Sequence, residues 1–460
     1  MDFEQFILAH EGEDPAQLAL ARGRFAAQVD DFDLALTTLE VRRKLRDKVP
    51  EWYAVPSLRF PLRVSGEQCS STSTARYKAS VARSSTDEAS VVREPSPSGT
   101  SSTDGASVVR GGRIADLTGG LGVDSWAFAQ VFGEVLYNEM RPELADAAAF
   151  NFRELGVTNI TVRNHALVPD SGPLVMADSD RPSPAASVSQ VLGSFEPDVI
   201  FLDPARRGTD GRKVFRLEDC QPDVLQLLPE LLDACPKLLL KLSPMADISL
   251  VCKQLGCVKE AHVVAAEGEC KELLLVLEKG WQGDHTLTIV EDGAVMKIPG
   301  DMGGIPQSSL RAPSHPCGWA PPSYVAEGGH GLGDATHISE TYLFEPGKAM
   351  LKAGAFDLPC RYGLTKQGQH THLYTGAEVP AELKPFGKCY RILESAPLDK
   401  RSIRTFGQKY PQAEVTARNI PLTSDQLRTK LSVRSGGTVH IFGLHSDATH
   451  SNLLLAASRA

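Results

Sequence analysis

Residues 114–125, which read IADLTGGLGVDS, constrain the fold more than any other stretch of this chain. Apolar residues lead into Asp116, a turn with three glycines follows, and the segment from Val123 has the apolar spacing of a helix. A strand that ends in an acid and continues through a glycine turn into a helix is the first unit of a doubly wound sheet. Glycine also lets the backbone approach a ligand closely and adopt positive φ. The stretch predicts an α/β fold with a nucleotide-type site.

The sequence after this motif continues the alternation of strands and helices. EVLYNEM predicts a second strand that ends at Glu139, ELADAAAFNFRELG predicts a helix, and NITVRN predicts a third strand that brings Asn164 to the same edge. An acid about twenty residues after the glycine turn suits a ribose diol. PDVIFLDPARRG, KLLLKLSPMADI and HVVAAEGECKELLLVLEKG supply the later strands. We therefore expect a Rossmann-like sheet.

Two common nucleotide motifs do not fit the glycine turn. A dinucleotide site has the pattern GxGxxG, whereas this chain has GGxG at Gly119, Gly120 and Gly122. A P-loop requires GK[ST] after its glycines, and that tripeptide does not follow here. The turn therefore belongs to another class of nucleotide-type site.

Low-complexity segments divide the rest of the chain. Its 460 residues, 42% of them hydrophobic, are enough for several domains with buried cores. Segments rich in Ser, Pro, Gly or small residues lie at 84–111, 178–187 and 299–335. The first contains the near-duplicates STDEASVVR and STDGASVVR and has no apolar periodicity, so we predict a disordered insertion there and a low-complexity insertion in the third. A helical region is expected at 1–62.

Composition also indicates the cellular compartment, the state of the cysteines and whether a metal site is expected. The sequence has no run of about 18 apolar residues, and its first residues are acidic where a secretion signal would be basic, so we expect a cytoplasmic protein with no membrane span. The nine cysteines have no repeated short spacing, which indicates reduced thiols. Cys252 and Cys257 are isolated from other ligands, and no metal site is expected.

Charge is distributed unevenly along the chain. From Lys384 to Ala460 there are 12 Lys and Arg against 5 Asp and Glu, a balance of +7, so the net charge of −9 leaves −16 for the preceding residues. A basic segment in an acidic chain suits a polyanion. The other interpretation, an ordinary solvated surface, is equally open from charge alone.

The glycine turn resembles motif I of class I S-adenosylmethionine-dependent methyltransferases, in which the acid and the turn hold the methionine part of the cofactor. This resemblance implies a set of cofactor-binding residues at the edge of the sheet: Asp116, Thr118, Gly119, Gly120, Gly122, Asp124, Glu139 and Asn164.

The segment LDPARR resembles motif IV of the same enzymes, usually [DNS]PP[YFW] where amino groups of bases are methylated. There the acid and the proline carbonyl accept hydrogen bonds from the amine, so the resemblance implies Asp203, Pro204 and Arg206 as catalytic residues and an exocyclic amine of guanine or adenine as acceptor. Ala205 and Arg206 stand at the third and fourth positions of the motif, so the aromatic residue that would stack on the base is missing. Arg206 would stack on the base instead, or bind phosphate.

The segment DPAR, because of its arginine, also resembles the DPPR motif of RNA 5-methyluridine methyltransferases. Carbon methylation of uracil needs a cysteine nucleophile after the next strand. In this chain that turn reads Ser243-Pro244, with no cysteine, which argues against the uracil mechanism. Lys241 and Ser243 are expected near the site, without assigned roles.

The whole series EQCSS, TARYKA, IADLTGGLGVDS, LDPARR, KLSPMADI, YLFEPGKAMLKAGAF, THLYT, ARNIPL and GGTVHIFG resembles bacterial class I methyltransferases with a C-terminal THUMP-like domain and an intervening ferredoxin-like domain. The resemblance implies a helical region at 1–62, a methyltransferase domain at 63–280, a ferredoxin-like domain at 281–383 and a THUMP-like domain at 384–460.

THUMP modules bind structured RNA, so the resemblance implies tRNA or rRNA as the partner and methylation of RNA as the reaction. Candidate phosphate contacts in the C-terminal domain are Lys400, Arg401, Arg404, Lys409, Arg418 and Arg434, with Arg428 and Lys430 as further cations. Two alternatives stay open: an RNA-binding protein with a catalytically weak methyltransferase core, and a methyltransferase for small molecules. The sequence does not indicate the oligomeric state.

Overall fold

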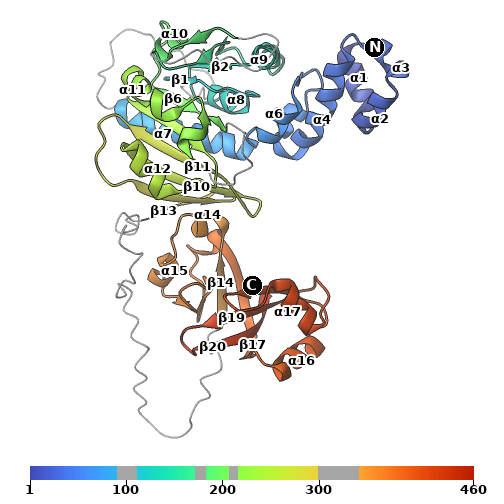
Figure 1. Cartoon of the computed structure of the whole chain (residues 1–460), viewed down its shortest axis with the longest axis vertical. Coiled ribbons are helices and arrows are strands. Elements are labelled where there is room, and N and C mark those ends of the chain that lie inside the picture. The colour runs from blue at the N-terminus through green and yellow to red at the C-terminus, as the bar shows by residue number, and fades with distance from the viewer. Residues whose placement is uncertain (91–110, 171–182, 207–215, 299–340) are drawn as a thin grey trace, which may run out of the picture. The chain divides into compact units, whose positions relative to one another are not determined.

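The computed structural model describes residues 1–90, 111–170, 183–206, 216–298 and 341–460, without the side chains of 85–90 and of Arg206. They form two compact units, the first comprising Met1–Ala261 and Glu272–Gly283, the second His262–Lys271 and Asp284–Ala460 (Figure 1). The insertion predicted at 299–335 and most of the one at 84–111 lie outside the described residues. No helix in the described part of the chain is long and apolar enough to cross a membrane.

The N-terminal region is helical, as predicted. Its helices are α1 (Phe3–His10), α2 (Pro15–Leu20), α3 (Arg22–Phe25), η1 (Ala26–Gln28), α4 (Phe32–Lys48), α5 (Pro50–Tyr53), α6 (Arg63–Gln68) and α7 (Thr72–Ser90). Asp2, Asp14 and Asp31 cap α1, α2 and α4 by accepting hydrogen bonds from backbone amides. These caps fix where each helix begins.

Helix α7 corrects one boundary of the sequence analysis. The insertion was expected to begin at about residue 84, but α7 continues to Ser90. Its buried face, which includes Ala75, Ala79 and Ala82, packs in the same core as the large sheet of the first unit. Once such a packed turn has formed, each further helical residue costs little, so the helix extends into a segment with no apolar pattern of its own.

The first unit is built on a large mixed sheet with the order β13-β12-β10-β11-β9-β6-β1-β2-β3. The strands are β1 (Arg113–Asp116), β2 (Glu134–Asn138), β3 (Ile160–Arg163), β6 (Val199–Leu202), β9 (Lys237–Leu242), β10 (Val258–Ala266), β11 (Glu269–Glu278), β12 (Thr286–Glu291) and β13 (Ala294–Ile298). Of these, β12, β13 and residues 262–271, which include the adjoining ends of β10 and β11, belong to the second unit. Strands β3, β2, β1, β6 and β9 are parallel neighbours, and β11 pairs antiparallel to β9. The predicted Rossmann-like fold is confirmed.

Helices and short two-stranded ladders complete the first unit (Figure 1). The helices are α8 (Val123–Ala129), α9 (Pro142–Glu154), α10 (Val188–Leu192), η2 (Leu217–Asp219), α11 (Val224–Ala234) and α12 (Ile248–Leu255). The ladders pair β4 (Ala166–Leu167) with β5 (Ala185–Ala186), and β7 (Ala205–Arg206) with β8 (Cys220–Gln221). Ile114, Phe201 and Leu239 are fully or almost fully buried on neighbouring strands, as expected for parallel strands covered on both faces.

The C-terminal part of the second unit contains a seven-stranded sheet with the order β15-β16-β14-β17-β20-β19-β18. Its strands are β14 (Tyr342–Pro346), β15 (Thr365–Lys366), β16 (Tyr374–Gly376), β17 (Gly387–Pro397), β18 (Glu414–Arg418), β19 (Val439–Ser446) and β20 (Ser451–Arg459), with helices α14 (Lys348–Lys352), α15 (Leu358–Arg361), η3 (Lys384–Phe386), α16 (Lys400–Lys409) and α17 (Ser424–Leu431). Phe406 of α16 and Leu427 of α17 share a core with Ile441 of the sheet. One face of this sheet is therefore covered by α16 and α17.

Candidate active site

The glycine turn between β1 and α8 has no room for side chains on its inner side. A Cβ atom at Gly119 would lie 2.1 Å from the ring of Tyr137, and one at Gly122, which has φ of +96°, would lie 2.8 Å from Phe152. The Tyr137 hydroxyl donates to the carbonyl of Gly120 at 2.6 Å. At Gly120, which has φ of +55°, an added Cβ would meet nothing closer than 3.9 Å, so the turn is open on that side. The turn is held rigidly and presents bare backbone there.

Asp116, at the end of β1, stabilises this turn through hydrogen bonds. Its carboxylate is fully buried and accepts hydrogen bonds from the Ser125 hydroxyl at 2.6 Å and from the Thr118 amide at 3.2 Å. Burial raises the pKa of Asp116 to about 8. These contacts give Asp116 a role in shaping the turn; contact with the methionine part of a ligand stays a prediction.

Glu139 lies just after β2 and faces the turn. One carboxylate oxygen accepts from the Gly120 amide at 2.9 Å and the other from the Arg141 amide at 2.8 Å. Burial raises the pKa of Glu139, and these two amides oppose the shift. Asn164, after β3, donates to the Glu139 carbonyl at 2.6 Å, so it holds the same corner in place. The structure thus brings Glu139 and Asn164 together with the glycine turn.

The turn is joined directly to the segment that resembles motif IV. The Asp203 amide, just after β6, donates to the Thr118 hydroxyl at 2.6 Å, although the two residues are far apart in sequence. Pro204 is buried and Ala205 is exposed. Arg206 pairs with Cys220 in a short ladder. The predicted cofactor-binding and catalytic segments therefore lie side by side at the carboxyl edge of the sheet.

Asp203 has a partner that the sequence did not assign to it. Lys241 of β9 donates from its Nζ atom to Oδ2 of Asp203 at 2.5 Å, and the two side chains are 13% and 34% exposed. Burial disfavours the Lys241 ammonium, but the carboxylates of Asp203 and Glu272 outweigh it and raise its pKa. Lys241 is therefore a cation next to the predicted catalytic carboxylate.

A second, deeper ion cluster lies in the same unit. Lys78 of α7 is fully buried, and its Nζ atom donates to the two oxygens of Glu272 at 3.0 and 2.9 Å. The same Nζ atom lies 3.3 Å from Asp124 and donates to the Ser70 hydroxyl at 3.0 Å, and that hydroxyl donates to Asp124 at 2.8 Å. Asp124, predicted to bind the cofactor, is thus part of this cluster.

Sequence reasoning missed Lys78 and Glu272 as site residues. Ser70 and Lys78 do fall in the block EQCSSTSTARYKA, whose resemblance to methyltransferases was the available signal. No pattern in that block indicates Glu272, which lies on β11. Lys241 on β9 and Glu272 on β11 lie on adjacent strands. Lys241 is opposite Leu274 in the ladder, and Glu272 is two residues from Leu274, so Lys241 and Glu272 lie on the same face because side chains alternate between faces along a strand.

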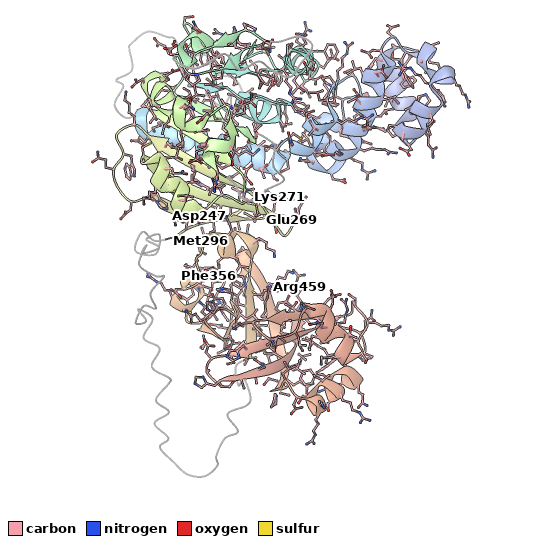
Figure 2. All side chains as sticks on the ribbon, in the orientation of Figure 1. Asp247, Glu269, Lys271, Met296, Phe356 and Arg459 are labelled. Atoms are coloured by element: carbon pink, nitrogen blue, oxygen red, sulfur yellow. The ribbon has the colours of Figure 1, made fainter. Side chains whose placement is uncertain are left out.

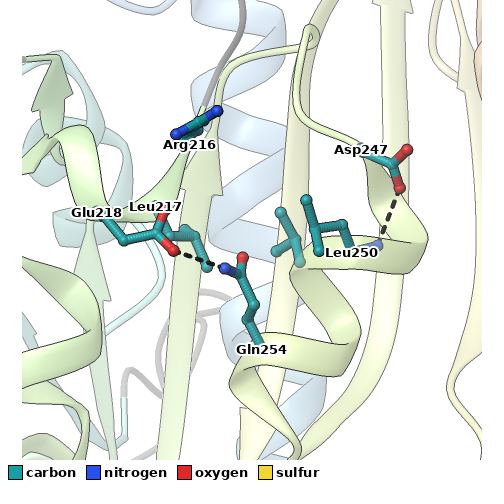
Figure 3. Close-up of a pocket in the computed structure, with 7 residues that line it drawn as sticks. Arg216, Leu217, Glu218, Asp247, Leu250 and Gln254 are labelled. Carbon is teal, nitrogen blue, oxygen red and sulfur yellow. Dashed lines mark hydrogen bonds between the residues drawn. The ribbon is translucent and has the colours of Figure 1, made fainter.

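A separate cavity of about 250 Å³ lies between η2 and α12 (Figure 3). Glu218 accepts a hydrogen bond from Gln254 at 2.8 Å, and Asp247 accepts one from the Leu250 amide at 2.9 Å. Its carboxylates already have partners, and none of its lining residues was predicted to be functional. Within the described ranges, no group of three His, Cys, Asp or Glu residues is placed to hold a metal ion.

Comparison with known proteins agrees with this geometry. Residues 342–383 match a family of ferredoxin-like domains, and residues 387–458 match a family described as THUMP domain-like. The crystal structure of a provisionally assigned methyltransferase from Porphyromonas gingivalis W83 aligns with 100% of this chain and 97% of its own, at 25% identity and a TM-score of 0.71. The chain has a methyltransferase fold with a THUMP-like C-terminal domain. The resemblance predicted from sequence is confirmed.

Other solved structures align with a smaller share of the chain. They include the B. subtilis tRNA methyltransferase TrmK, at 14% identity over 38% of this chain and 63% of its own, with a TM-score of 0.25. The T. thermophilus 16S rRNA methyltransferase RsmC, in complex with AdoMet and guanosine, aligns at 15% identity over 37% of this chain and 38% of its own, with a TM-score of 0.26. These scores are too low to support an inference about this chain. No curated protein sequence matches it.

The predicted RNA contacts in the THUMP-like domain fall into two groups. Lys400, Arg401 and Arg404 are exposed on α16 at helical spacing, and Arg434 is also exposed. Lys409 and Arg418, by contrast, donate to Glu394 and Glu345, each at 2.8 Å. The further cation Arg428 is paired with Asp425. Lys400, Arg401 and Arg404 of α16 are the stronger candidates for phosphate contact, because Lys409, although 54% exposed, is paired with Glu394.

Proposed function

We propose that this protein is an S-adenosylmethionine-dependent methyltransferase that acts on RNA. The observation that carries the proposal is the hydrogen bond between Thr118 and the Asp203 amide. It joins the glycine turn, where the methyl donor would bind, to the segment where the acceptor would bind. Transfer of a methyl group depends chiefly on holding donor and acceptor in line, which such a junction does.

The residues around the glycine turn fit the methyl donor. The open side of Gly120 leaves space for a ligand against bare backbone. Each oxygen of Glu139 accepts one amide hydrogen and retains a lone pair that can accept from a ribose hydroxyl. Bound there, S-adenosylmethionine would supply an electrophilic methyl group on sulfur. The protein would bind and orient it through the turn, Glu139 and the Asn164 corner.

The second unit supplies the reason to propose RNA. Its THUMP-like domain displays the cations of α16. A cavity of about 460 Å³ in the same unit is lined by further cations, Lys384, Lys388 and Arg459; Arg459, near the end of β20, is labelled in Figure 2. Contacts of this kind position a nucleic acid through its phosphates without reading its sequence.

Transfer of a radiolabelled methyl group to RNA tests the proposal. Total tRNA and rRNA from a host that lacks this protein are incubated with the full chain and labelled S-adenosylmethionine. We expect label in RNA, and we expect Asp203→Ala to lower the rate by about a hundredfold or more while the protein remains folded, because the side chain lies where the acceptor must be oriented.

Two results would contradict the proposal. Binding of S-adenosylmethionine without label in any RNA would favour a protein that only binds RNA. Turnover on small molecules that does not depend on the α16 cations would favour a small-molecule enzyme.

A further inference from the structure

Four ionisable side chains from four separate elements gather behind the predicted acceptor position: Lys78 on α7, Asp203 after β6, Lys241 on β9 and Glu272 on β11. From this arrangement we infer that the methyl acceptor is a hydroxyl group, the ribose 2′-hydroxyl of RNA, and not an amine of a base. The inference rests on the proposed function, and it names the atom on which that function acts.

The charge that develops on the acceptor decides between the two groups. An amine that attacks a methyl group gains positive charge, and a neighbouring ammonium would oppose that change. A hydroxyl loses a proton and gains negative character on oxygen, which an adjacent ammonium stabilises. The Lys241 ammonium lies 2.5 Å from Asp203. A carboxylate beside a fixed cation is therefore better suited to activate a hydroxyl than to orient an amine.

Exposure shows which end of the cluster an acceptor can reach. The side chains of Lys78 and Glu272 are 0% and 3% exposed, whereas that of Asp203 is 34% exposed. Lys241 lies between these limits at 13%. An entering hydroxyl would therefore contact Asp203 and Lys241, while Lys78 and Glu272 would act as positioning residues through Lys241.

The pair at the open end can carry out both parts of the transfer. Oδ2 of Asp203 is occupied by Lys241, which leaves Oδ1 to accept the hydroxyl hydrogen. The hydroxyl oxygen bonds to the methyl carbon as the carbon–sulfur bond breaks and its electron pair stays on sulfur. The hydroxyl proton passes to Asp203 and from there to solvent, while Lys241 donates to the oxygen. No other reactant is required.

The deeper pair keeps Lys241 charged and in place. The Glu272 and Asp203 carboxylates both raise the pKa of Lys241 against the effect of burial. Lys78 in turn holds Glu272 through both of its oxygens, so that Glu272 cannot swing away. The two lysines thus compensate the carboxylates around them, Asp124 included, in a site where an isolated charge would be costly.

The absence of an aromatic residue in the segment DPAR also favours ribose over base. Enzymes that methylate base amines stack the base on that aromatic side chain, at the fourth position of the motif, but here that position holds Arg206. A ribose hydroxyl needs no such platform, because it lies on the backbone of the RNA and is presented when the phosphates are held.

Chemical analysis of labelled RNA tests this inference. RNA methylated by the full chain is divided: one part is hydrolysed with alkali and the other is digested to nucleosides. Alkali cleaves RNA through the 2′-hydroxyl, so a 2′-O-methyl group leaves an alkali-stable dinucleotide. We expect the label in such dinucleotides and in 2′-O-methylnucleosides. A synthetic RNA with deoxyribose at the mapped nucleotide should accept no methyl group.

Label in a base-methylated mononucleotide would overturn the inference and leave the proposed function intact. No label in any RNA with the wild-type protein would remove the proposed function, and the inference with it. The two failures are therefore distinguishable.

Substitution of Lys241 provides a second test. We expect Lys241→Met to lower kcat by about a hundredfold or more with little change in KM for RNA, and to move the rise of the pH–rate profile to higher pH. Lys241→Arg should restore part of the activity, because it restores the cation. Binding of S-adenosylmethionine, measured by calorimetry, should be unchanged. An amine acceptor would instead be methylated as fast or faster by Lys241→Met, which would overturn the inference.

A matched control is available next to the cluster in sequence. Lys271, labelled in Figure 2, precedes Glu272 and is paired at the surface with Glu267 and Glu269. Lys271→Met removes a charge of the same kind from the opposite face of the strand, and we expect it to leave kcat and the pH profile unchanged. An equal loss in this control would show that the effect of Lys241→Met is not specific to the site.

Discussion

Lysine and arginine are used in opposite ways in the two units of this protein. In the catalytic unit, Lys78 and Lys241 are buried or nearly so, and each is bound to carboxylates. In the THUMP-like domain, Lys400, Arg401 and Arg404 are exposed on one helix. A buried cation with fixed partners shapes a local field for one reacting atom, whereas exposed cations attract a polyanion of many conformations.

The two uses differ in what a lost charge should cost. Removal of a buried partner leaves another charge without compensation in the interior, which affects both stability and chemistry. Removal of an exposed cation weakens attraction that solvent and salt already screen. The comparison therefore predicts large effects in the catalytic unit and small, salt-dependent effects in the THUMP-like domain.

The largest effect on stability is expected at Lys78. Lys78→Met should lower the free energy of unfolding by about 3 to 5 kcal/mol, because Glu272 and Asp124 would remain buried with no cation between them. Denaturant unfolding of the full chain measures this change. The double variant Lys78→Met/Glu272→Gln should recover part of the loss.

Lys44 gives a control on the same N-terminal region. It is paired with Glu67, and the two side chains are 38% and 61% exposed. Lys44→Met should cost less than about 1 kcal/mol, as is usual for surface ion pairs. If both substitutions had similar costs, the buried cluster would contribute no more than an ordinary surface pair, and the comparison would fail.

A smaller effect on the free energy of unfolding is expected from the titration of Asp116. The pKa of Asp116 in the folded protein is about 8, against an ordinary value of 3.8, so between these values the folded state binds the proton and the unfolded state does not. Stability from this group therefore falls as pH rises, by about 1.4 kcal/mol per pH unit, or about 2 kcal/mol between pH 6 and pH 7.5.

Asp116→Asn isolates that contribution. Asparagine resembles the protonated carboxyl, can pair with Ser125 and does not titrate, so the variant should lose stability less steeply than the wild type over this range. Unfolding in denaturant at pH 6 and pH 7.5 measures the difference between the two slopes. Parallel slopes would show that Asp116 is ionised in the folded protein at pH 6.

Much of the catalytic edge could be predicted from sequence because its signals are local. The glycine turn, Glu139 after β2 and Asp203 after β6 are each marked by a strand and its end within a few residues. The cluster of Lys78, Lys241 and Glu272 could not be assembled in this way. Its members lie on three elements far apart in sequence, and their proximity depends on the order of β9 and β11 in the sheet and on the packing of α7.

The THUMP-like domain shows the same limit of prediction from sequence. The excess of cations from Lys384 onward was visible in composition, and the positions of Lys400, Arg401 and Arg404 on a helix follow from their spacing. Composition could not separate these residues from Arg418, whose partner Glu345 lies on β14 in the ferredoxin-like domain. Roles predicted for individual residues at both sites stay predictions until they are tested by substitution.

The smallest effect per residue is expected on α16, and it should appear as a change in salt dependence. Replacing Lys400, Arg401 and Arg404 with Gln should lower the magnitude of the slope of log K against log salt by about 2 to 3 if all three contact phosphates, since each contact releases about 0.7 ion from a single strand and about 0.9 from a duplex. Lys409→Gln is the matched control on the same helix. Because Lys409 is paired with Glu394, this substitution should change the slope less than any one of the three.

Point substitutions are preferable to truncation at residue 384, because β17 to β20 complete the sheet that contains β14. Filter binding of labelled tRNA across a salt series measures the slopes. Equal effects from all four positions would mean that an ion pair at the surface does not keep a cation from the RNA, and the distinction between exposed and paired cations in this domain would have to be abandoned.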